Sequence, residues 1–316
     1  MYRTLVTALV SLVSLAAVVT ACSQPSIPSP AAVPATIASS GTITVTDFLE
    51  RELTLSSPVR SFVSLSPSNT EILFALGLGA RVVGVTTFDD YPPEVKDIQP
   101  IGGLVDPDME RLVALNPDLV LVTGLHVKNG VISRLEENGL KTLVLDPTDM
   151  DGIFRSISLV ARVGGIEDTG GGVVAALKQG IRRVKDTVAV SSDRPLVFWV
   201  TWHDPLWTTG RDTFIHDLIE TGGGTNIFSD ISDFQKVSLE QVLARNPQII
   251  ITNTGHGASV DLVWKWANEE PRLKGTTARQ QGRVYLVDAN LVNRPGPRIV
   301  LGLEMVARAI HPELFP

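Results

Sequence analysis

Two stretches of the chain contain a glutamate, an asparagine and a histidine at the same spacing. Residues 109–126 are MERLVALNPDLVLVTGLH and residues 239–256 are LEQVLARNPQIIITNTGH, and the two align without a gap. Glu, Ala, Asn, Pro and His are identical at matched positions, so Glu240 follows Glu110 by 130 residues. A pair of carboxylates on two similar surfaces can set the orientation and the encounter rate of a charged partner.

The elements that position these residues are a short helix, an Asn-Pro connection and a buried strand. Asp108 and Ser238 are expected helix N-caps, and Ser238 forms a capping box with Gln241. His126 and His256 follow the carboxyl ends of the two strands, where parallel α/β sheets bind ligands. We therefore predict two similar lobes that face each other across a cleft. The alternative is that a common helix–strand connection recurs by accident.

Short apolar runs alternate with helical stretches, which predicts an α/β fold of two Rossmann-like lobes with mostly parallel sheets. A helix is expected over SPSNTEILFALG, with Ser68 and Glu71 as a capping box and Gly77 as its C-cap. A hairpin is expected at 43–55, strands at 62–65, 81–85, 118–122, 141–145 and 196–200, and helices at 109–116 and 132–138.

A helical stretch without a strand pattern covers residues 149–190 and separates an N-terminal lobe, 42–148, from a C-terminal lobe, 191–316. Its apolar residues recur at helical spacing, so we expect one long backbone helix that joins the lobes, with the ligand cleft between them. Glycines at 164–165 and 170–172 predict a kink or a break in it.

The amino end has the features of an export signal. Arg3 precedes an apolar stretch over residues 5–19, which is too short and too polar for a membrane span. Small residues then precede Cys22 in a pattern that resembles the lipobox of bacterial lipoproteins. The resemblance implies a signal peptide over residues 1–21 and a lipid on Cys22 that anchors the protein outside the cytoplasm. The alternative is an ordinary signal peptide with an incidental cysteine. Residues 22–41, rich in Pro, Ser and Ala, predict an extended tether.

Composition excludes several classes of function. The chain has 316 residues and a formal net charge of −7, which does not suit electrostatic binding of nucleic acid. Its single cysteine allows no internal disulfide and no structural Cys/His zinc cluster. No nucleophile elbow, H-E-x-x-H, Walker A or dinucleotide-binding motif is present, so we do not expect an enzyme. The remaining catalytic alternative is a cleft enzyme that uses His203 and Asp204.

Aromatic residues gather in the second half, where all five tryptophans lie. Part of this group is expected in a loop after the strand at 196–200, and flat rings offer a ligand a large contact area at low entropic cost. The alternative is that the tryptophans fill the core of the lobe. The candidates on cleft loops are Trp202, Trp207, Phe88 and a further matched pair, Leu104 and Phe234.

Five stretches resemble the helical-backbone substrate-binding proteins of ABC importers, a family that includes vitamin B12, ferric-siderophore and haem receptors. They are VSLSPSNTEILFALGLGARVVGVTTFDDYPPE, PDMERLVALNPDLVLVTG, WTTGRDTFIHDLIETGGGTNIF, VSLEQVLARNPQIII and RPGPRIVLGLEMV. The resemblance implies two α/β lobes bridged by a long helix. It also implies a monomer that delivers a small-molecule ligand to a permease dimer with a cytoplasmic ATPase. The family's permease-docking glutamates fall on Glu110 and Glu240.

The resemblance is closest to the vitamin B12 receptors, so a corrinoid is the expected ligand, and a ferric siderophore or haem is the alternative. The expected ligand-binding residues are Phe88, Leu104, His126, Trp202, Trp207, Phe234, His256, Asn290 and Arg294. Leu104 and His126 depart from the aromatic pattern of the B12 receptors. A siderophore would use Arg294 and Arg211 as cations, and haem would use His126, His203 or His256 as an iron ligand. A zinc or manganese receptor would need three or four convergent ligands.

Overall fold

The structure is a computed structural model that describes residues 41–254 and 261–315. The predicted signal peptide, Cys22, the tether up to residue 40 and His256 lie outside the described residues. In the part of the chain that is described, none of the helices has the length and apolar character that a membrane crossing requires.

The N-terminal lobe is built on a four-stranded parallel sheet of order β4-β3-β5-β6. An antiparallel hairpin, β1 with β2, precedes it, as predicted. The strands are β1 (Gly41–Thr46), β2 (Glu52–Ser57), β3 (Phe62–Ser64), β4 (Val82–Gly84), β5 (Leu119–Val122) and β6 (Thr142–Val144). The helices are α1 (Pro67–Ala75), α2 (Met109–Leu115), α3 (Gly124–Lys128) and α4 (Val131–Glu137), with short 3-10 turns at Gly79–Arg81 and Pro93–Asp97.

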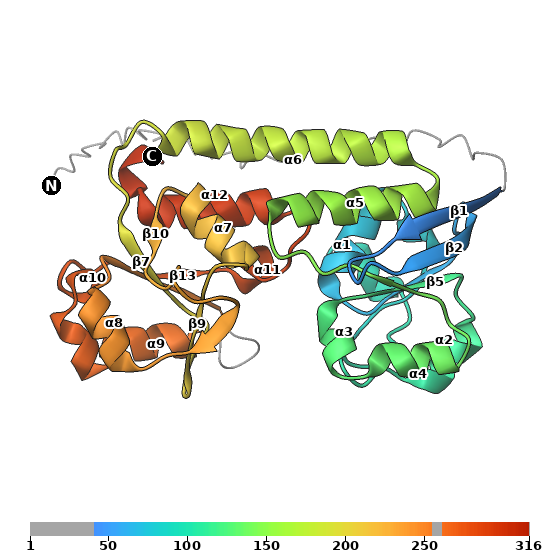
Figure 1. Cartoon of the computed structure of the whole chain (residues 1–316), viewed down its shortest axis with the longest axis horizontal. Helices are drawn as coiled ribbons and strands as arrows, with labels where there is room; N and C mark the ends of the chain where they lie inside the picture. Colours follow the sequence, from blue (N-terminus) through green and yellow to red (C-terminus); the bar gives the residue numbers. More distant parts are fainter. Residues whose placement is uncertain (1–40, 255–260, 316) are drawn as a thin grey trace, which may run out of the picture. The chain divides into compact units, whose positions relative to one another are not determined.

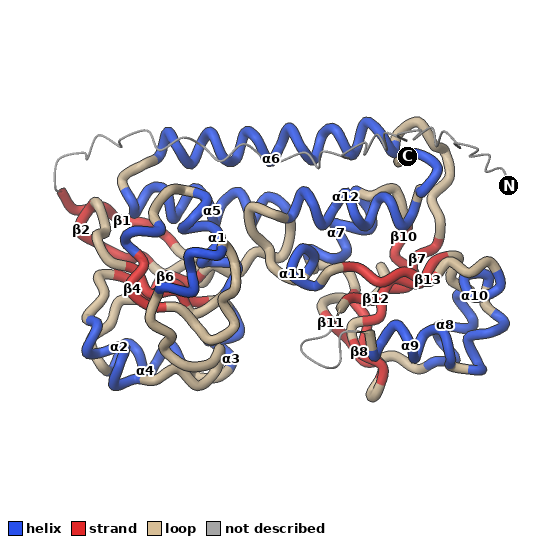
Figure 2. The backbone as a smooth tube through the Cα atoms, turned by 180° about the vertical axis from the view of Figure 1, so that it is seen from behind, coloured by secondary structure: helices blue, strands red, loops and turns tan. Residues whose placement is uncertain are grey.

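The C-terminal lobe repeats this plan with a parallel sheet of order β10-β7-β12-β13 and adds an antiparallel sheet of order β11-β9-β8. Its strands are β7 (Leu196–Val200), β8 (Trp202–His203), β9 (Leu206–Thr209), β10 (Thr225–Asn226), β11 (Phe234–Lys236), β12 (Ile249–Asn253) and β13 (Val284–Val287). Its helices are α7 (Phe214–Thr221), α8 (Leu239–Arg245), α9 (Leu262–Glu269), α10 (Thr277–Gln280), α11 (Ala289–Val292) and α12 (Ile299–Ile310), with 3-10 turns at Pro271–Gly275 and Pro312–Leu314. The fold class is therefore confirmed: α/β, with two lobes on separate parallel sheets (Figure 2).

Two helices connect the lobes, α5 (Met150–Gly164) and α6 (Glu167–Val188). The break between them falls at Gly165, which ends α5 in the left-handed conformation with φ +70°. No break occurs at residues 170–172, which lie inside α6. Gly170 instead permits close packing, because a Cβ there would lie 2.4 Å from Cβ of Ala161. Helix α6 packs along both α5 and α12 (Figure 1), so it contacts elements of both lobes.

Each parallel sheet is buried on both faces, which explains its continuous apolar strands. In β5, Leu119 and Leu121 enter a core that also holds residues of α5, α6 and α12, whereas Val120 and Val122 enter a second core beneath α2 and α4. Strand β12 alternates in the same way: Ile251 points into the shared core. The inner faces of the two sheets therefore contribute to one continuous hydrophobic core.

Two local predictions are wrong. Ser68 and Glu71 do not form a capping box, because α1 begins at Pro67 with Ser66 as its N-cap. Proline suits the first helical turn, since its missing N–H has no intrahelical partner there. Residues 202–207 do not form an open loop but the β8–β9 hairpin, in which Trp202 pairs with Trp207.

Candidate ligand-binding site

A cavity of about 370 Å³ lies where the carboxyl ends of the N-terminal strands meet the segment after β13. Loops in this position line the ligand crevice of open α/β sheets. Most of its lining is uncharged. The lining residues are Ser66, Pro67, Ser68, Thr87, Phe88, Asp90, Leu104, Thr123, Leu125, His126, Ala289, Asn290, Asn293 and Arg294. The structure thus brings together Phe88, Leu104, His126, Asn290 and Arg294 of the predicted site.

His126 occupies the third position of α3 and is fully buried. Its Nδ1 accepts a hydrogen bond from the backbone N–H of Thr123 at 2.9 Å, so the neutral ring carries its proton on Nε2. Nε2 has no hydrogen-bond partner within bonding distance among the described residues. Burial lowers the pKa of His126, although nearby backbone groups oppose this effect. The site therefore contains a neutral imidazole near physiological pH.

Arg294 is the only cation among the described lining residues, and its charge is already balanced. Its Nη1 lies 2.5 Å from Oδ1 of Asp90 and 3.3 Å from Oε1 of Glu71. The hydrogen bond from Arg294 holds the pKa of Asp90 below its usual range. Because a guanidinium between two carboxylates presents little free positive charge, the cavity offers an anionic ligand no uncompensated cation. Arg211 lies outside this cavity, beside Asp212.

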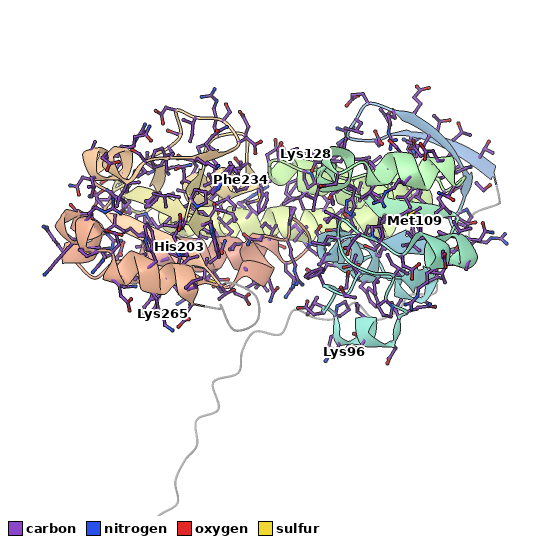
Figure 3. The ribbon with its side chains drawn as sticks, turned by 90° about the horizontal axis from the view of Figure 1, so that it is seen from below. Lys96, Met109, Lys128, His203, Phe234 and Lys265 are labelled. Carbon is purple, nitrogen blue, oxygen red and sulfur yellow. The ribbon has the colours of Figure 1, made fainter. Side chains whose placement is uncertain are left out.

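The predicted aromatic residues of the C-terminal lobe lie outside the described cavity. Trp202 is 41% exposed at the β8–β9 hairpin, and its Nε1 donates to the carbonyl of Asp204 at 2.8 Å. Trp207 pairs with Lys236 of β11, and Lys236 Nζ lies 5.5 Å from the ring centroid. Phe234 begins β11 and is half-buried. Figure 3 shows Phe234 and His203 on this lobe, with Lys128 and Met109 on the other.

The matched glutamates occupy equivalent places in the two lobes. Glu110 lies in the first turn of α2, which Asp108 caps, and Glu240 lies in the first turn of α8, which Ser238 caps. Both side chains are exposed, and β5 and β12 belong to different sheets. Hydrogen bonds from its own backbone and from Ser238 lower the pKa of Glu240, and the charge of Arg272 contributes. Both carboxylates are thus available to a partner.

The described residues also bear on the predicted metal-binding and His203–Asp204 alternatives. No group of three or more His, Cys, Asp or Glu side chains within residues 41–254 and 261–315 could hold a metal ion. His203 lies between Trp202 and Trp266, with ring centroids 5.1 and 5.8 Å away. Its Nδ1 has no hydrogen-bond partner in these ranges, so His203 and Asp204 form no catalytic dyad there.

Comparison with known proteins decides the family. The family described as "Periplasmic binding protein" matches residues 62–291, which is most of the chain. The chain belongs to the periplasmic binding protein family. It is therefore an extracytoplasmic substrate-binding protein of an ABC transporter, with a small-molecule ligand and a permease as partners. This family comprises binding proteins rather than enzymes.

Individual relatives differ in what their names say they bind. The chain is 30% identical over 279 residues to the uncharacterized ABC transporter substrate-binding lipoprotein YvrC of Bacillus subtilis, covering 86% of this chain and 87% of that protein. It is 30% identical over 280 residues to the cobalamin-binding protein of Halobacterium salinarum, covering 85% and 74% of the two chains. The periplasmic heme-binding protein RhuT of Roseiflexus sp. RS-1 is 26% identical with a TM-score of 0.72, covering 81% of this chain and 99% of that one.

Sequence reasoning missed three residues beside the cavity. Asp90 lines it, and Glu71 and Arg298 form an ion pair with a Nη2–Oε1 distance of 2.6 Å behind it. Glu71 and Arg298 are 227 residues apart, so local spacing carries no signal of their contact. The one available clue was a glutamate next to Ile72 and Leu73 in an apolar helix, which needs a buried partner.

Proposed function

We propose that this protein captures a corrinoid such as cobalamin between its lobes and delivers it to an ABC permease. The observation that carries the proposal is the charge balance of the cavity, where Asp90 and Glu71 neutralise Arg294. A corrinoid is large and largely flat, and amide groups rather than free acids cover its rim. Such a ligand needs hydrogen-bond partners and apolar area, not an uncompensated cation.

The lining offers both kinds of contact. Asn290 and Asn293 of the C-terminal lobe can pair with ligand amides, since each side-chain amide both donates and accepts. Phe88 is 48% exposed and offers a free aromatic face. The cavity is smaller than a whole corrinoid, so the ligand would extend toward Trp202, Trp207 and Phe234. The cobalamin-binding relative of Halobacterium salinarum supports this choice of ligand.

Delivery to the permease is assigned to Glu110 and Glu240, which are exposed and placed alike on α2 and α8. Carboxylates in this arrangement suit basic pockets on a two-fold symmetric partner. We assign residues 1–21 to a lipoprotein signal peptide and residues 22–40 to a tether that begins at a lipidated Cys22; Gly41, predicted as the last tether residue, instead begins β1. The YvrC relative is a lipoprotein, which supports this anchor. Residues 42–148 and 191–316 are the two lobes and residues 149–190 connect them.

Titration of the full-length protein in detergent micelles with cyanocobalamin tests the ligand. Isothermal titration calorimetry is expected to show saturable binding at one site per chain. Asn290→Ala and Phe88→Ala are expected to weaken it by roughly tenfold each, the loss that follows from one hydrogen bond or one ring contact. Leu301→Ala, at an exposed position of α12, is the control and should bind as the wild type does. Absence of binding at high micromolar cyanocobalamin would contradict the proposal.

Haem is the second candidate, because the neutral His126 lines the cavity and imidazole is a common axial ligand of haem iron. Haemin added to the same preparation would then give a Soret band that shifts on ligation. His126→Ala should abolish the shift, while cyanocobalamin should fail to compete. A siderophore receives less support, since the balanced Arg294 provides no free positive charge for an anionic chelate.

A further inference from the structure

A single buried carboxylate of the N-terminal lobe holds two arginines of the C-terminal lobe. The side chain of Glu71, in α1, is 1% exposed. Its Oε2 accepts from Nε of Arg298 at 2.8 Å and its Oε1 from Nη2 at 2.6 Å, which is a bidentate ion pair. Arg294, from the same segment between α11 and α12, reaches Oε1 at 3.3 Å. This segment therefore joins the lobes on the side where the cavity lies.

Among the described residues, the hydrogen bonds of the Glu71 side chain go to the C-terminal lobe. Glu71 does not cap α1, and its neighbours Ile72 and Leu73 are buried core residues. A buried carboxylate is costly unless charged and hydrogen-bonded partners surround it. Both of its arginine partners come from the other lobe, so its charge is compensated only when the lobes are docked here.

Each arginine also has a second contact, to the loop that follows β4. The guanidinium of Arg298 lies 3.9 Å from the centroid of the Tyr91 ring, within the range of a cation–π contact. Arg294 contacts Asp90, next to Tyr91 in sequence. Gly296, between the two arginines, lies close to α1: a Cβ there would be in ordinary van der Waals contact with the carbonyl oxygen of Ser68, at 3.4 Å.

The two partners of Arg294 differ in exposure. The side chain of Glu71 is 1% exposed, whereas that of Asp90 is 57% exposed, and Arg294 itself is 10% exposed. Glu71 is held in place by its burial and by its bidentate pair with Arg298. The exposed Asp90 carboxylate, although it is the nearer partner of Arg294, can move into water at low cost. Glu71 is thus the fixed partner of Arg294, and Asp90, which lines the cavity, is the exchangeable partner.

We propose that Glu71 is a positioning residue that fixes Arg294 at the cavity, and that Asp90 is a placeholder that a ligand oxygen displaces. The ligand part rests on the corrinoid proposal, whereas the positioning part does not. A carbonyl oxygen of the ligand takes the place of the Asp90 carboxylate, and Glu71 keeps the guanidinium in position. Glu71 then lies between two guanidinium groups and balances one of their charges. The displaced Asp90 carboxylate stays beside the cavity and balances the other, so the ligand oxygen can be neutral.

The two carboxylates are expected to act in opposite directions on binding. In titrations of full-length protein with cyanocobalamin, Glu71→Gln should weaken binding by roughly tenfold, because Arg294 loses its fixed partner. Asp90→Asn should strengthen binding several-fold, because the competing charge is gone. Asp230→Asn is the control for the loss of a bidentate arginine pair: the pair of Asp230 with Arg245 is more exposed and lies inside one lobe. Its affinity should equal that of the wild type.

A loss of stability alone can be separated from a loss of positioning. Glu71→Gln combined with Arg298→Gln removes both buried charges and should recover much of the thermal stability that Glu71→Gln loses. Its affinity for cyanocobalamin should stay low, because Arg294 still lacks its fixed partner. Recovery of affinity together with stability would overturn the positioning role.

A measurement without ligand keeps the proposal testable if cyanocobalamin does not bind. Hydrogen–deuterium exchange should show faster exchange of residues 289–298 in Glu71→Gln, and no change there in Asp230→Asn. Unchanged exchange in Glu71→Gln would refute the positioning role, whatever the ligand. Weakened binding in Asp90→Asn would refute the placeholder role. If the wild-type protein binds no cyanocobalamin but residues 289–298 still exchange faster in Glu71→Gln, only the corrinoid proposal and the ligand step are refuted.

Discussion

The helix–strand connections of the two lobes have the same local structure. The C-caps of helices α2 and α8 are Asn116 and Asn246, which are left-handed with φ of 43° and 42°. A proline follows each asparagine, and a central strand of a parallel sheet follows the proline. Asparagine tolerates this conformation better than other residues with a side chain. The connection itself therefore accounts for the Asn-Pro identity, whereas it does not require the exposed Glu110 and Glu240.

Beyond the strands the two lobes differ. Strand β5 leads into α3, which brings His126 to the cavity. The described C-terminal lobe reaches the cavity through residues 289–294 instead, and it places its antiparallel sheet, β11-β9-β8, beside its parallel sheet. Within the described residues, the two halves share the helix–strand framework but line the cavity with different elements.

The largest expected effect concerns the shared core. Leu121→Ala in β5 and Ile251→Ala in β12 should each lower the free energy of unfolding by about 2–5 kcal/mol, because each leaves a cavity in a fully buried site. Urea denaturation followed by circular dichroism should remain one transition in both variants, since both side chains enter one core. The control is Val113→Ala, 44% exposed on α2, which should cost less than about 0.5 kcal/mol. Two separate transitions would show that the lobes unfold independently.

The next effect concerns the matched glutamates. Glu110→Ala and Glu240→Ala should each lower cyanocobalamin uptake by cells roughly tenfold, and the double variant should lower it to background, if both sites contact the permease. Both side chains are exposed, so thermal stability and cyanocobalamin affinity should stay unchanged. Glu136→Ala, an exposed carboxylate paired with Arg51 elsewhere on the N-terminal lobe, is the control. Normal uptake by either single variant would show that the two glutamates do not contribute equally to docking on the permease.

Much of the fold could be predicted, because its strands are apolar runs and its helix ends carry local signals. The caps at Asp108 and Ser238 are present as predicted. Glu71 was misassigned because its partners, Arg294 and Arg298, lie more than two hundred residues away. The spacing of residues along a helix indicates contacts within that helix, but it carries no information about contacts between the two lobes.

The predicted site residues agree with the cavity better in the N-terminal lobe than in the C-terminal lobe, where, of the predicted residues that are described, only Asn290 and Arg294 line it. The residues that follow N-terminal strands, such as Phe88 and His126, line the cavity, because strand order places loop residues at one edge of a sheet. Trp202 and Trp207 do not, because their segment forms a hairpin whose pairing with β11 depends on residues about 30 positions later. Sequence pattern alone does not carry that tertiary pairing.

A smaller effect tests the shared connection. Asn116→Ala and Asn246→Ala should each cost about 1 kcal/mol of unfolding free energy, since alanine disfavours the left-handed conformation. The cost should be larger for Asn246, whose side chain also bonds the hydroxyl and the backbone N–H of Thr277. Asn116→Gly, which keeps the conformation accessible, is the control and should change stability little. Equal costs at both positions would show that the Thr277 contact contributes nothing.

The smallest effect is a pH dependence that comes from the N-terminal lobe. Burial lowers the pKa of folded His126, so below its ordinary value of about 6.5 the unfolded chain binds a proton that the folded chain does not. The unfolding free energy should therefore fall as the pH drops below that value, until folded His126 itself becomes protonated. The urea midpoints of the wild type and of His126→Gln, compared between pH 7.5 and 5, measure this pH dependence. The difference in slope of unfolding free energy against pH corresponds to at most one proton. Parallel curves for the two proteins would mean that His126 keeps its ordinary pKa in the folded N-terminal lobe.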